Sequence, residues 1–156
     1  MRVYKLKAFA RFQRREGIAD AGLVKAVRSA EEGLVDAELG GGLIKQRVAR
    51  AGQGKSGGFR TVIAFRRGER SVFLYGFAKS ERANIDHDEL EALRDVARAY
   101  LELEPKRIEA AIAEGELMEV RYDEKEYGEN GTARQGAVEV GDRRGNARPA
   151  QDRRGE

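Results

Sequence analysis

Three strand-like runs follow one another near the centre of the chain, and they constrain the fold more than any other feature. They cover residues 43–49, 59–66 and 71–78, and each is rich in apolar side chains. The tripeptide at 67–69 separates the last two runs, which is typical of a hairpin turn. A glycine-rich loop separates the first two. The sequence therefore predicts three neighbouring strands, with the last two paired in a hairpin.

Helical patterns precede and follow these strands. Apolar residues recur at helical spacing on both sides, and several of these stretches end at a glycine. Asp86 or Asp88 is suited to begin the third helix, and Pro105 suits the first turn of the fourth. The predicted elements are helices at about 9–17, 20–33, 86–101 and 105–115, a short strand at 3–7, and an edge strand or packed extension at 117–120.

Composition narrows the chemistry that the chain can perform. The chain has 156 residues, no cysteine and one histidine. Disulfides and thiolate zinc sites are therefore excluded, and we expect no metal ion or cofactor. The longest apolar-rich run, 72–78, is far shorter than the ~20 residues that span a bilayer. The charged N-terminus lacks a signal-peptide core, so we expect a cytoplasmic protein that does not engage a membrane.

The chain divides into two parts by composition. Residues 1–122 contain the periodic apolar patterns and predict one folded domain. Residues 123–156 contain 15 charged residues, six glycines and no Leu, Ile or Phe. Such a segment cannot bury enough apolar area to offset the entropy of ordering. We therefore expect a charged, glycine-rich disordered tail from residue 123 onward.

Positive charge is concentrated in the central strands and at the N-terminus. Residues 44–82 contain ten Lys or Arg against two acids, and residues 1–15 contain six bases and no acid. Residues 83–120 contain eleven acids against four bases, so the formal net charge of the chain is only +3. A locally basic surface of this kind usually binds a polyanion, most often nucleic acid.

Strand alternation predicts which of these cations share a face. Side chains at every second position of a strand lie on the same face of a sheet. If Ile44, Phe59 and Val72 face the core, the opposite, open face gathers Lys45, Arg47, Arg60, Tyr75, Phe77 and Lys79. Lys55 reaches the same face from the glycine-rich loop. Cations with interleaved aromatic rings suit the binding of an unpaired RNA strand.

Other interpretations of these residues stay open. The basic face can be an ordinary solvated surface, and Tyr75 and Phe77 can belong to the core, because both faces of the run at 71–78 are apolar. The tripeptide Gly-Lys-Ser at 54–56 matches the end of a nucleotide-binding P-loop. That motif requires an earlier glycine where Ala49 stands, and a helix where this sequence continues as a strand. We therefore do not expect a P-loop.

Several stretches of the chain together indicate a family. They are Gly17–Asp20, Gly33–Gly41, Ile44–Ala49 continuing into Gly52–Thr61, Tyr75–Ile85 and Glu116–Val120. These stretches resemble the RelE/HigB-type toxins of bacterial type II toxin–antitoxin systems, within the RelE/ParE superfamily. The segment Gly-Gln-Gly-Lys-Ser-Gly-Gly-Phe-Arg at 52–60 is quite specific. The resemblance covers roughly residues 1–121 and does not include the tail.

The resemblance implies a fold, an activity and partners. The implied fold is the α+β, RelE-like microbial RNase fold, a small and mainly antiparallel sheet with helices packed on one face. The implied activity is that of a ribosome-dependent endoribonuclease, or mRNA interferase, which inhibits translation. Its implied partners are mRNA on the ribosome and a cognate antitoxin. In HigB-type systems the antitoxin is usually a HigA-like helix-turn-helix protein that also represses the operon.

Metal-independent RNA cleavage by attack of the 2′-hydroxyl on phosphorus requires a charge clamp, a proton acceptor and a proton donor. No candidate residue is a histidine, so Lys, Arg and Tyr must supply these functions. The predicted catalytic assignments are Arg60 for the phosphorane, Lys55 or Lys45 for the base, and Lys79 or Tyr75 for the acid. The predicted RNA-binding residues are Arg47 and Arg50 for backbone phosphates and Phe77 for stacking on a base.

Two further functions fit the sequence. The first is a ParE-like toxin that blocks a protein partner such as gyrase without cutting RNA. Clustered cations such as Lys45, Lys55 and Arg60 argue against it, because a blocking protein does not need them around a glycine-rich loop. The second is an inactive nucleic-acid-binding remnant. The extra residues after 122 keep it open, because they could cover the active face.

Overall fold

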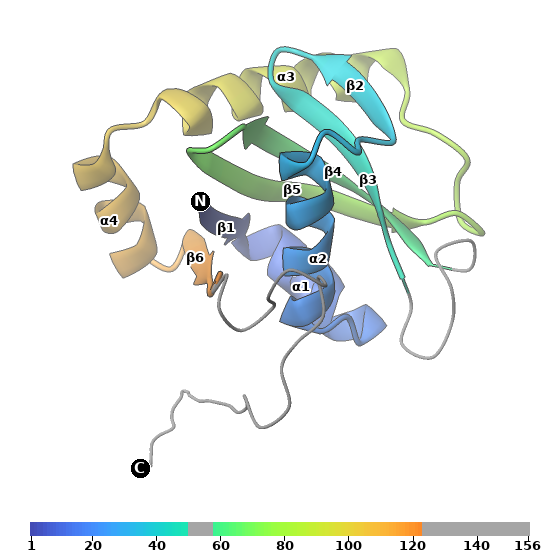
Figure 1. Cartoon of the computed structure of the whole chain (residues 1–156), viewed down its shortest axis with the longest axis horizontal. Helices are drawn as coiled ribbons and strands as arrows, with labels where there is room; N and C mark the ends of the chain where they lie inside the picture. The colour runs from blue at the N-terminus through green and yellow to red at the C-terminus, as the bar shows by residue number, and fades with distance from the viewer. Residues whose placement is uncertain (50–57, 123–156) are drawn as a thin grey trace. The chain divides into compact units, whose positions relative to one another are not determined.

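Six strands and four helices form the part of the chain that the computed structural model describes, residues 1–49 and 58–122 (Figure 1). The strands are β1 (Arg2–Leu6), β2 (Ala37–Gly40), β3 (Leu43–Val48), β4 (Phe59–Arg66), β5 (Arg70–Ala78) and β6 (Leu117–Val120). The helices are α1 (Lys7–Glu16), α2 (Asp20–Glu31), α3 (His87–Glu102) and α4 (Pro105–Ala113). The predicted tail lies outside the described residues, as do Arg50 and Lys55. No described helix is long and apolar enough to cross a membrane.

All described strands belong to one sheet, in the order β2-β3-β4-β5-β1-β6. Neighbouring strands are antiparallel, except that β1 runs parallel to β5. The two edge strands, β2 and β6, lie at opposite ends of the sheet (Figure 1). The predicted α+β class and the mainly antiparallel sheet of a RelE-like fold are confirmed.

The short edge strand β2 is an element that periodicity did not predict. This four-residue strand is antiparallel to β3, with Ala37 opposite Lys45 and an irregularity between Glu38 and Gly40. Three consecutive glycines, Gly40, Gly41 and Gly42, have φ angles of 87°, 64° and 83°. Glycine adopts this left-handed backbone at little cost, so the tripeptide can turn the chain sharply from β2 into β3. Alternation cannot be recognised over so short a run.

The helices α1 and α2 cover one face of the sheet. Phe12 of α1 packs edge-on against Phe59 of β4, with ring centroids 5.6 Å apart. Gln46 of β3 donates its side-chain N–H to the carbonyl of Ala26 in α2 at 2.9 Å. Strand pairing puts Gln46 and Phe59 on the same face. This face therefore holds the core beneath the first two helices.

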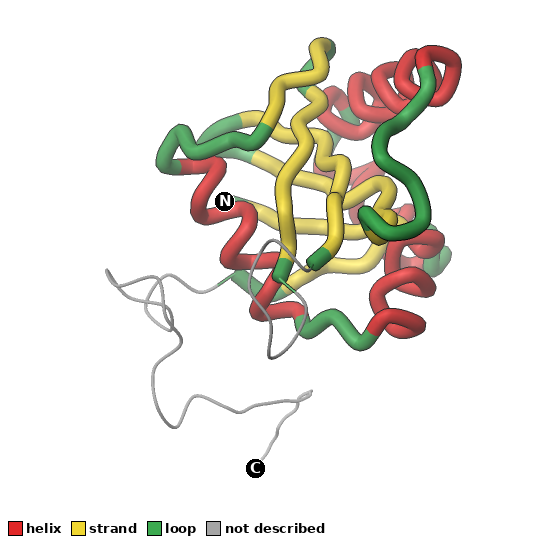
Figure 2. The backbone as a smooth tube through the Cα atoms, turned by 90° about the vertical axis from the view of Figure 1, so that its right-hand side faces the viewer, coloured by secondary structure: helices red, strands yellow, loops and turns green. Residues whose placement is uncertain are grey.

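The helices α3 and α4 cover part of the other face. One buried cluster joins Leu43 and Val72 of the sheet to Leu101 of α3 and Ile108 of α4. The expectation that helices pack on one face is therefore wrong, and Figure 2 shows helices on both sides of the twisted sheet. The physical reason is that the interior strands β4 and β5 bury apolar side chains on both faces of the sheet. The apolar stripe of α3 is buried there.

Contacts at both ends fix α3 in place. At its start, the Asp86 side chain accepts the N–H of Glu89, and the Glu89 carboxylate accepts the N–H of Asp86, forming a capping box. Its last turn contains no cation of its own. Arg66 and Arg70 of the β4–β5 hairpin instead donate to the carbonyls of residues 100, 101 and 103. The hairpin thus satisfies the carbonyls that the helix end leaves free.

Gly76 of β5 allows a test of the packing of α1. A Cβ at this position would lie 2.7 Å from Cδ2 of Phe12, closer than packed atoms approach. We expect Gly76→Ala to lower the free energy of unfolding by about 1–3 kcal/mol, because it overpacks the core. Urea denaturation measures this change. Combining it with Phe12→Leu should cost less than the two single changes added together, whereas strictly additive costs would contradict the contact.

Candidate active site

The register of the three central strands places the predicted site residues in rows. β4 pairs with β3 on one side and with β5 on the other, and directly opposed residues share a face. Two rows of opposed residues are Lys45–Val62–Tyr75 and Arg47–Arg60–Phe77. Both lie on the face opposite α1 and α2, in agreement with strand alternation. We call this face the Arg60 face.

A β-bulge in β5 makes this arrangement possible. Val62 pairs with Tyr75 and Ile63 pairs with Phe73, which leaves Leu74 without an opposed residue. Strict alternation would put Val72 and Tyr75 on opposite faces, and that expectation is wrong. Because of the extra residue, Tyr75 lies on the same face as Val72, and α3 covers Val72.

Arg60 is the one Lys or Arg that is buried within residues 1–49 and 58–122. It is 9% exposed, and its Nη1 atom is buried with no hydrogen-bond partner in this part of the chain. An unsatisfied buried polar group typically costs about 1–3 kcal/mol, and more if it is charged. Arg47 stands directly opposite, and like charges at such positions repel. A costly arrangement of this kind fits a donor that is reserved for an anionic ligand.

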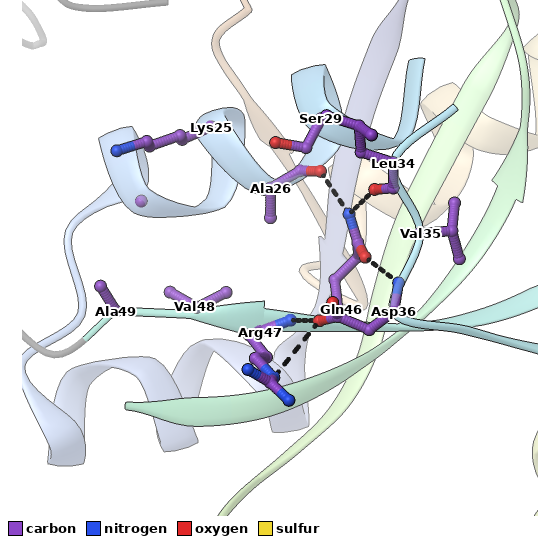
Figure 3. Close-up of a pocket in the computed structure, with 11 residues that line it drawn as sticks. Lys25, Ala26, Ser29, Leu34, Val35, Asp36, Gln46, Arg47, Val48 and Ala49 are labelled. Carbon is purple, nitrogen blue, oxygen red and sulfur yellow. Dashed lines mark hydrogen bonds and ion pairs between the residues drawn. The ribbon is translucent and has the colours of Figure 1, made fainter. Parts of the chain in front are cut away.

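Arg47 is positioned by Asp36. The Arg47 backbone N–H donates to Asp36 Oδ2 at 2.7 Å, and its Nε lies 3.9 Å from the same oxygen. Gln46 holds Asp36 in place, because its side-chain oxygen accepts the Asp36 N–H at 2.9 Å. Figure 3 shows these contacts beside a groove of about 280 Å³ between α2 and β3. The Arg47 side chain stays 46% exposed, so an anion can reach it.

Arg82 belongs to this face although sequence reasoning assigned it no role. Its guanidinium binds the Glu89 carboxylate through two nitrogens and donates to the Tyr75 hydroxyl at 3.2 Å. Its Cζ lies 5.7 Å from the centroid of the Phe77 ring, which is 2% exposed. Stacking of Phe77 on a base would therefore require Arg82 to move aside. The sequence feature that could have pointed to Arg82 is its position, because it is the last cation of the basic region and precedes the acidic α3.

The Arg82–Glu89 pair holds both groups in their charged forms. Hydrogen bonds to Glu89, and then to Tyr75, raise the pKa of Arg82 above its ordinary value. The hydrogen bond from Arg82 is the main cause that lowers the pKa of Glu89 below 4.5. Both side chains are consequently ionised at neutral pH. The charge of Arg82 is thus compensated by Glu89, whereas no acid of residues 1–49 and 58–122 forms an ion pair with Arg60.

Two of the remaining predicted residues, Lys45 and Lys79, lie in or next to the central strands. Lys45 is partly buried in β3, and Lys79 is exposed immediately after β5. Lys55 and Arg50 lie outside the described residues, so their roles stay predictions. Across residues 1–49 and 58–122, no three His, Cys, Asp or Glu side chains gather as the ligands of a metal would.

One comparison with known proteins gives a match over nearly all of the described chain. The family model for the RelE toxin of the RelE/RelB toxin–antitoxin system matches residues 1–120. The matched region contains every described helix and strand, from β1 to β6. No curated protein matches the sequence.

Replacement of Glu89 by Gln tests the Arg82–Glu89 pair. Gln preserves the shape and can still complete the capping box, so the change removes mainly the charge. Because the pKa of Glu89 is lowered in the folded protein, its stabilisation is present above the unfolded pKa near 4.5. That stabilisation is lost as pH falls through the folded pKa. We expect Glu89→Gln to lower the melting temperature at pH 7.

Thermal melts followed by circular dichroism at several pH values measure this effect. The difference in melting temperature between wild type and Glu89→Gln should shrink as pH falls below 4.5 and through the lowered pKa of Glu89 in the folded protein. His87→Gln, at the exposed start of the same helix, serves as a control that leaves the pair intact. A difference between wild type and Glu89→Gln that is equal at pH 7 and pH 2 would contradict the pair.

Proposed function

This chain belongs to the RelE toxin family of toxin–antitoxin systems, and from that premise we propose that it is a ribosome-dependent endoribonuclease. In this proposal it cuts mRNA during translation and thereby inhibits protein synthesis. The observation that supports it is the buried Nη1 atom of Arg60, which has no hydrogen-bond partner within the described residues, with Arg47 directly opposite. Two adjacent guanidinium groups suit a phosphate, which accepts their N–H groups in pairs.

The proposed reaction uses side chains alone. The 2′-oxygen of a ribose loses its proton and bonds to the adjacent phosphorus, while the bond from phosphorus to the 5′-oxygen breaks. The leaving 5′-oxygen takes up one proton. The products are a 2′,3′-cyclic phosphate and a 5′-hydroxyl, so one proton is removed and one is delivered. The protein must accept the first, donate the second and stabilise the negative phosphorane between them.

Arg60 is assigned to the phosphorane. Its guanidinium is always charged, and its planar fork matches two phosphate oxygens. Because Nη1 has no partner within the described residues, a phosphate would not have to displace an existing hydrogen bond. Partial enclosure by protein also lowers the local dielectric, which strengthens the attraction. These properties suit Arg60 to the stabilisation of the phosphorane.

Proton transfer is assigned to the neighbouring row. Lys45 and Tyr75 stand at its two ends, on either side of Val62. We assign the 2′ proton to Lys45 or Lys55, and the proton for the leaving oxygen to Tyr75 or Lys79. The Tyr75 hydroxyl accepts a hydrogen bond from Arg82, so its own proton remains available for donation.

The flanking contacts complete the proposed RNA site. Arg47 and Arg50 would hold phosphates on either side of the cut, as point contacts with the backbone. Phe77 would stack on a base once Arg82 leaves its ring.

The toxin family also implies a cognate antitoxin. We propose that this antitoxin is a HigA-like helix-turn-helix protein encoded beside the toxin, and that it neutralises the nuclease. Because the proposed substrate is mRNA on a translating ribosome, the proposed location of the toxin is the cytoplasm.

Removal of the Arg60 guanidinium tests the function directly. We expect Arg60→Ala to reduce cleavage about 10²–10³-fold, as loss of a group that stabilises the transition-state charge does. Primer extension on a defined mRNA in a translating extract measures the cuts. Arg60→Lys retains charge without the planar fork and should give an intermediate loss. The free energy of unfolding should stay equal or rise, because the Nη1 atom of Arg60 has no hydrogen-bond partner within the described residues.

Two results would oppose the proposal. If wild type left the message intact and translation unimpaired, the nuclease assignment would fail. If wild type cut the message and Arg60→Ala cut it equally well, Arg60 would have no part in the reaction. Expression in cells distinguishes the nuclease from the ParE-like alternative when protein synthesis and DNA damage are both followed over time. A nuclease stops protein synthesis first, whereas a gyrase blocker first raises DNA damage.

A further inference from the structure

Arg82 has a hydrogen-bond acceptor at each of its three side-chain nitrogen atoms. Its Nε donates to the carbonyl of Asn84 at 2.9 Å, and its Nη1 donates to Glu89 Oε2 at 3.1 Å and to the Tyr75 hydroxyl at 3.2 Å. Its Nη2 donates to Glu89 Oε1. The guanidinium of Arg82 is therefore held firmly in the free protein, whereas Nη1 of Arg60 has no partner among the described residues.

The held guanidinium covers groups that the proposed active site needs. The Cζ atom of Arg82 lies 5.7 Å from the centroid of the Phe77 ring, and Phe77 is 2% exposed. The Tyr75 hydroxyl, which is assigned to the leaving oxygen, is bound to the same guanidinium. Phe77 stands directly opposite Arg60, so the covered ring belongs to the row that is assigned to the phosphorane. Arg82 therefore lies where a base of RNA would have to stack.

The Glu89 carboxylate binds Arg82 in the way that a phosphate would. Two oxygens of one anionic group accept N–H groups from two nitrogens of the guanidinium. A phosphate offers a guanidinium the same paired arrangement. The pair is within reach of solvent, because the side chains of Arg82 and Glu89 are 29% and 40% exposed. Ion pairs as exposed as this one contribute little to stability, so a phosphate can compete with the carboxylate.

Glu89 keeps a second partner when Arg82 is removed from it. Its Oε1 atom also accepts the backbone N–H of Asp86 at 3.3 Å, as part of the capping box of α3. The carboxylate is therefore not left unpaired when Arg82 turns to another anion. Arg82 itself lies in the link between β5 and α3, outside both elements. Movement of its side chain thus requires no break in the sheet or in the helix.

We propose, on the basis of the function proposed above, that Glu89 and Arg82 form a latch that keeps the free toxin closed and that RNA opens. A phosphate of the message replaces the Glu89 carboxylate on the guanidinium of Arg82. Arg82 then leaves the Phe77 ring, on which a base stacks, and releases the hydroxyl of Tyr75. Glu89 is thus an internal substitute for phosphate, and Arg82 is a further RNA-binding residue of the site.

A permanent structural pair is the alternative to the latch. In that arrangement Arg82 stays on Glu89 and only positions the Tyr75 hydroxyl, so Phe77 remains covered and no base stacks on it. The two arrangements predict opposite effects when the pair is weakened. Opening of a latch raises the affinity for RNA, whereas loss of a structural pair leaves that affinity unchanged or lowers it.

Binding of an RNA strand that resists cleavage tests the latch without depending on nuclease activity. The probe is a short single-stranded RNA with 2′-O-methyl riboses, and fluorescence anisotropy follows its binding to the full chain over a series of salt concentrations. We expect Glu89→Gln to bind about 2–5-fold more tightly than wild type, the range that corresponds to loss of an exposed ion pair. Arg82→Gln removes the phosphate ligand and should lower the slope of log affinity against log salt by about 0.7.

A matched control separates the latch from general electrostatics. Asp88→Asn removes one negative charge from the same turn of α3, and Asp88 has no hydrogen bond or ion pair with Arg82. It should gain less affinity than Glu89→Gln, because it reports only the reduced repulsion of RNA. When Arg82 is already Gln, Glu89→Gln should add no more affinity than Asp88→Asn does. All variants are compared at a temperature at which circular dichroism shows them folded.

The outcomes for the latch and for the nuclease are distinct. If Glu89→Gln gains affinity only when Arg82 is present, the latch is supported; if wild type then cuts no mRNA, the nuclease proposal alone fails. Equal gains for Glu89→Gln and Asp88→Asn would overturn the latch, as would unchanged or weaker binding by Glu89→Gln. The latch would also be overturned if neither wild type nor Glu89→Gln bound the strand, whatever the cleavage assay showed.

Discussion

The pairing of β4 with both of its neighbours is the constraint on which the site depends. Because β4 is an interior strand, Arg60 has an opposed residue on each side, Arg47 in β3 and Phe77 in β5. On an edge strand, water would solvate the same guanidinium. Its Nη1 atom would then not be buried without a hydrogen-bond partner. A slip of one residue in β3 or β5 would move Arg47 or Phe77 to the other face. Strand register therefore brings three separate segments together into one surface.

The helix α3 connects the stability of the fold to the electrostatics of that surface. Glu89 accepts the backbone N–H of Asp86 in the capping box, and the same carboxylate binds Arg82. The arginine in turn covers the Phe77 ring. The start of α3 thus determines which cations of the face are compensated and which are not. Arg60 has no such acid among the residues that the structure describes, so its charge is not balanced there.

Much of the fold could be predicted from the sequence, because the spacing of apolar residues indicates which positions are buried. Spacing predicted the helices, the central strands and the hairpin. Alternation placed Arg60 with Tyr75, but it could not reveal the bulge at Leu74, since β5 is apolar at both parities. The contact of Arg82 with Glu89 was not predictable either, because it depends on how α3 lies against the sheet. Periodicity within one element carries no information on such packing. The expectation of helices on one face came from the family resemblance, and the burial of α3 against the other face corrects it.

The central claim is that the 2′-hydroxyl of RNA attacks a phosphate that is held on the Arg60 face. The most direct measurement uses an mRNA with a single 2′-deoxyribose at the nucleotide 5′ to a mapped cut, translated with the wild-type toxin. The account predicts that this cut disappears while other cuts persist, and that the unmodified message yields 5′ fragments ending in a 2′,3′-cyclic phosphate. Continued cleavage at the deoxy position would contradict it, because the attacking oxygen would be absent.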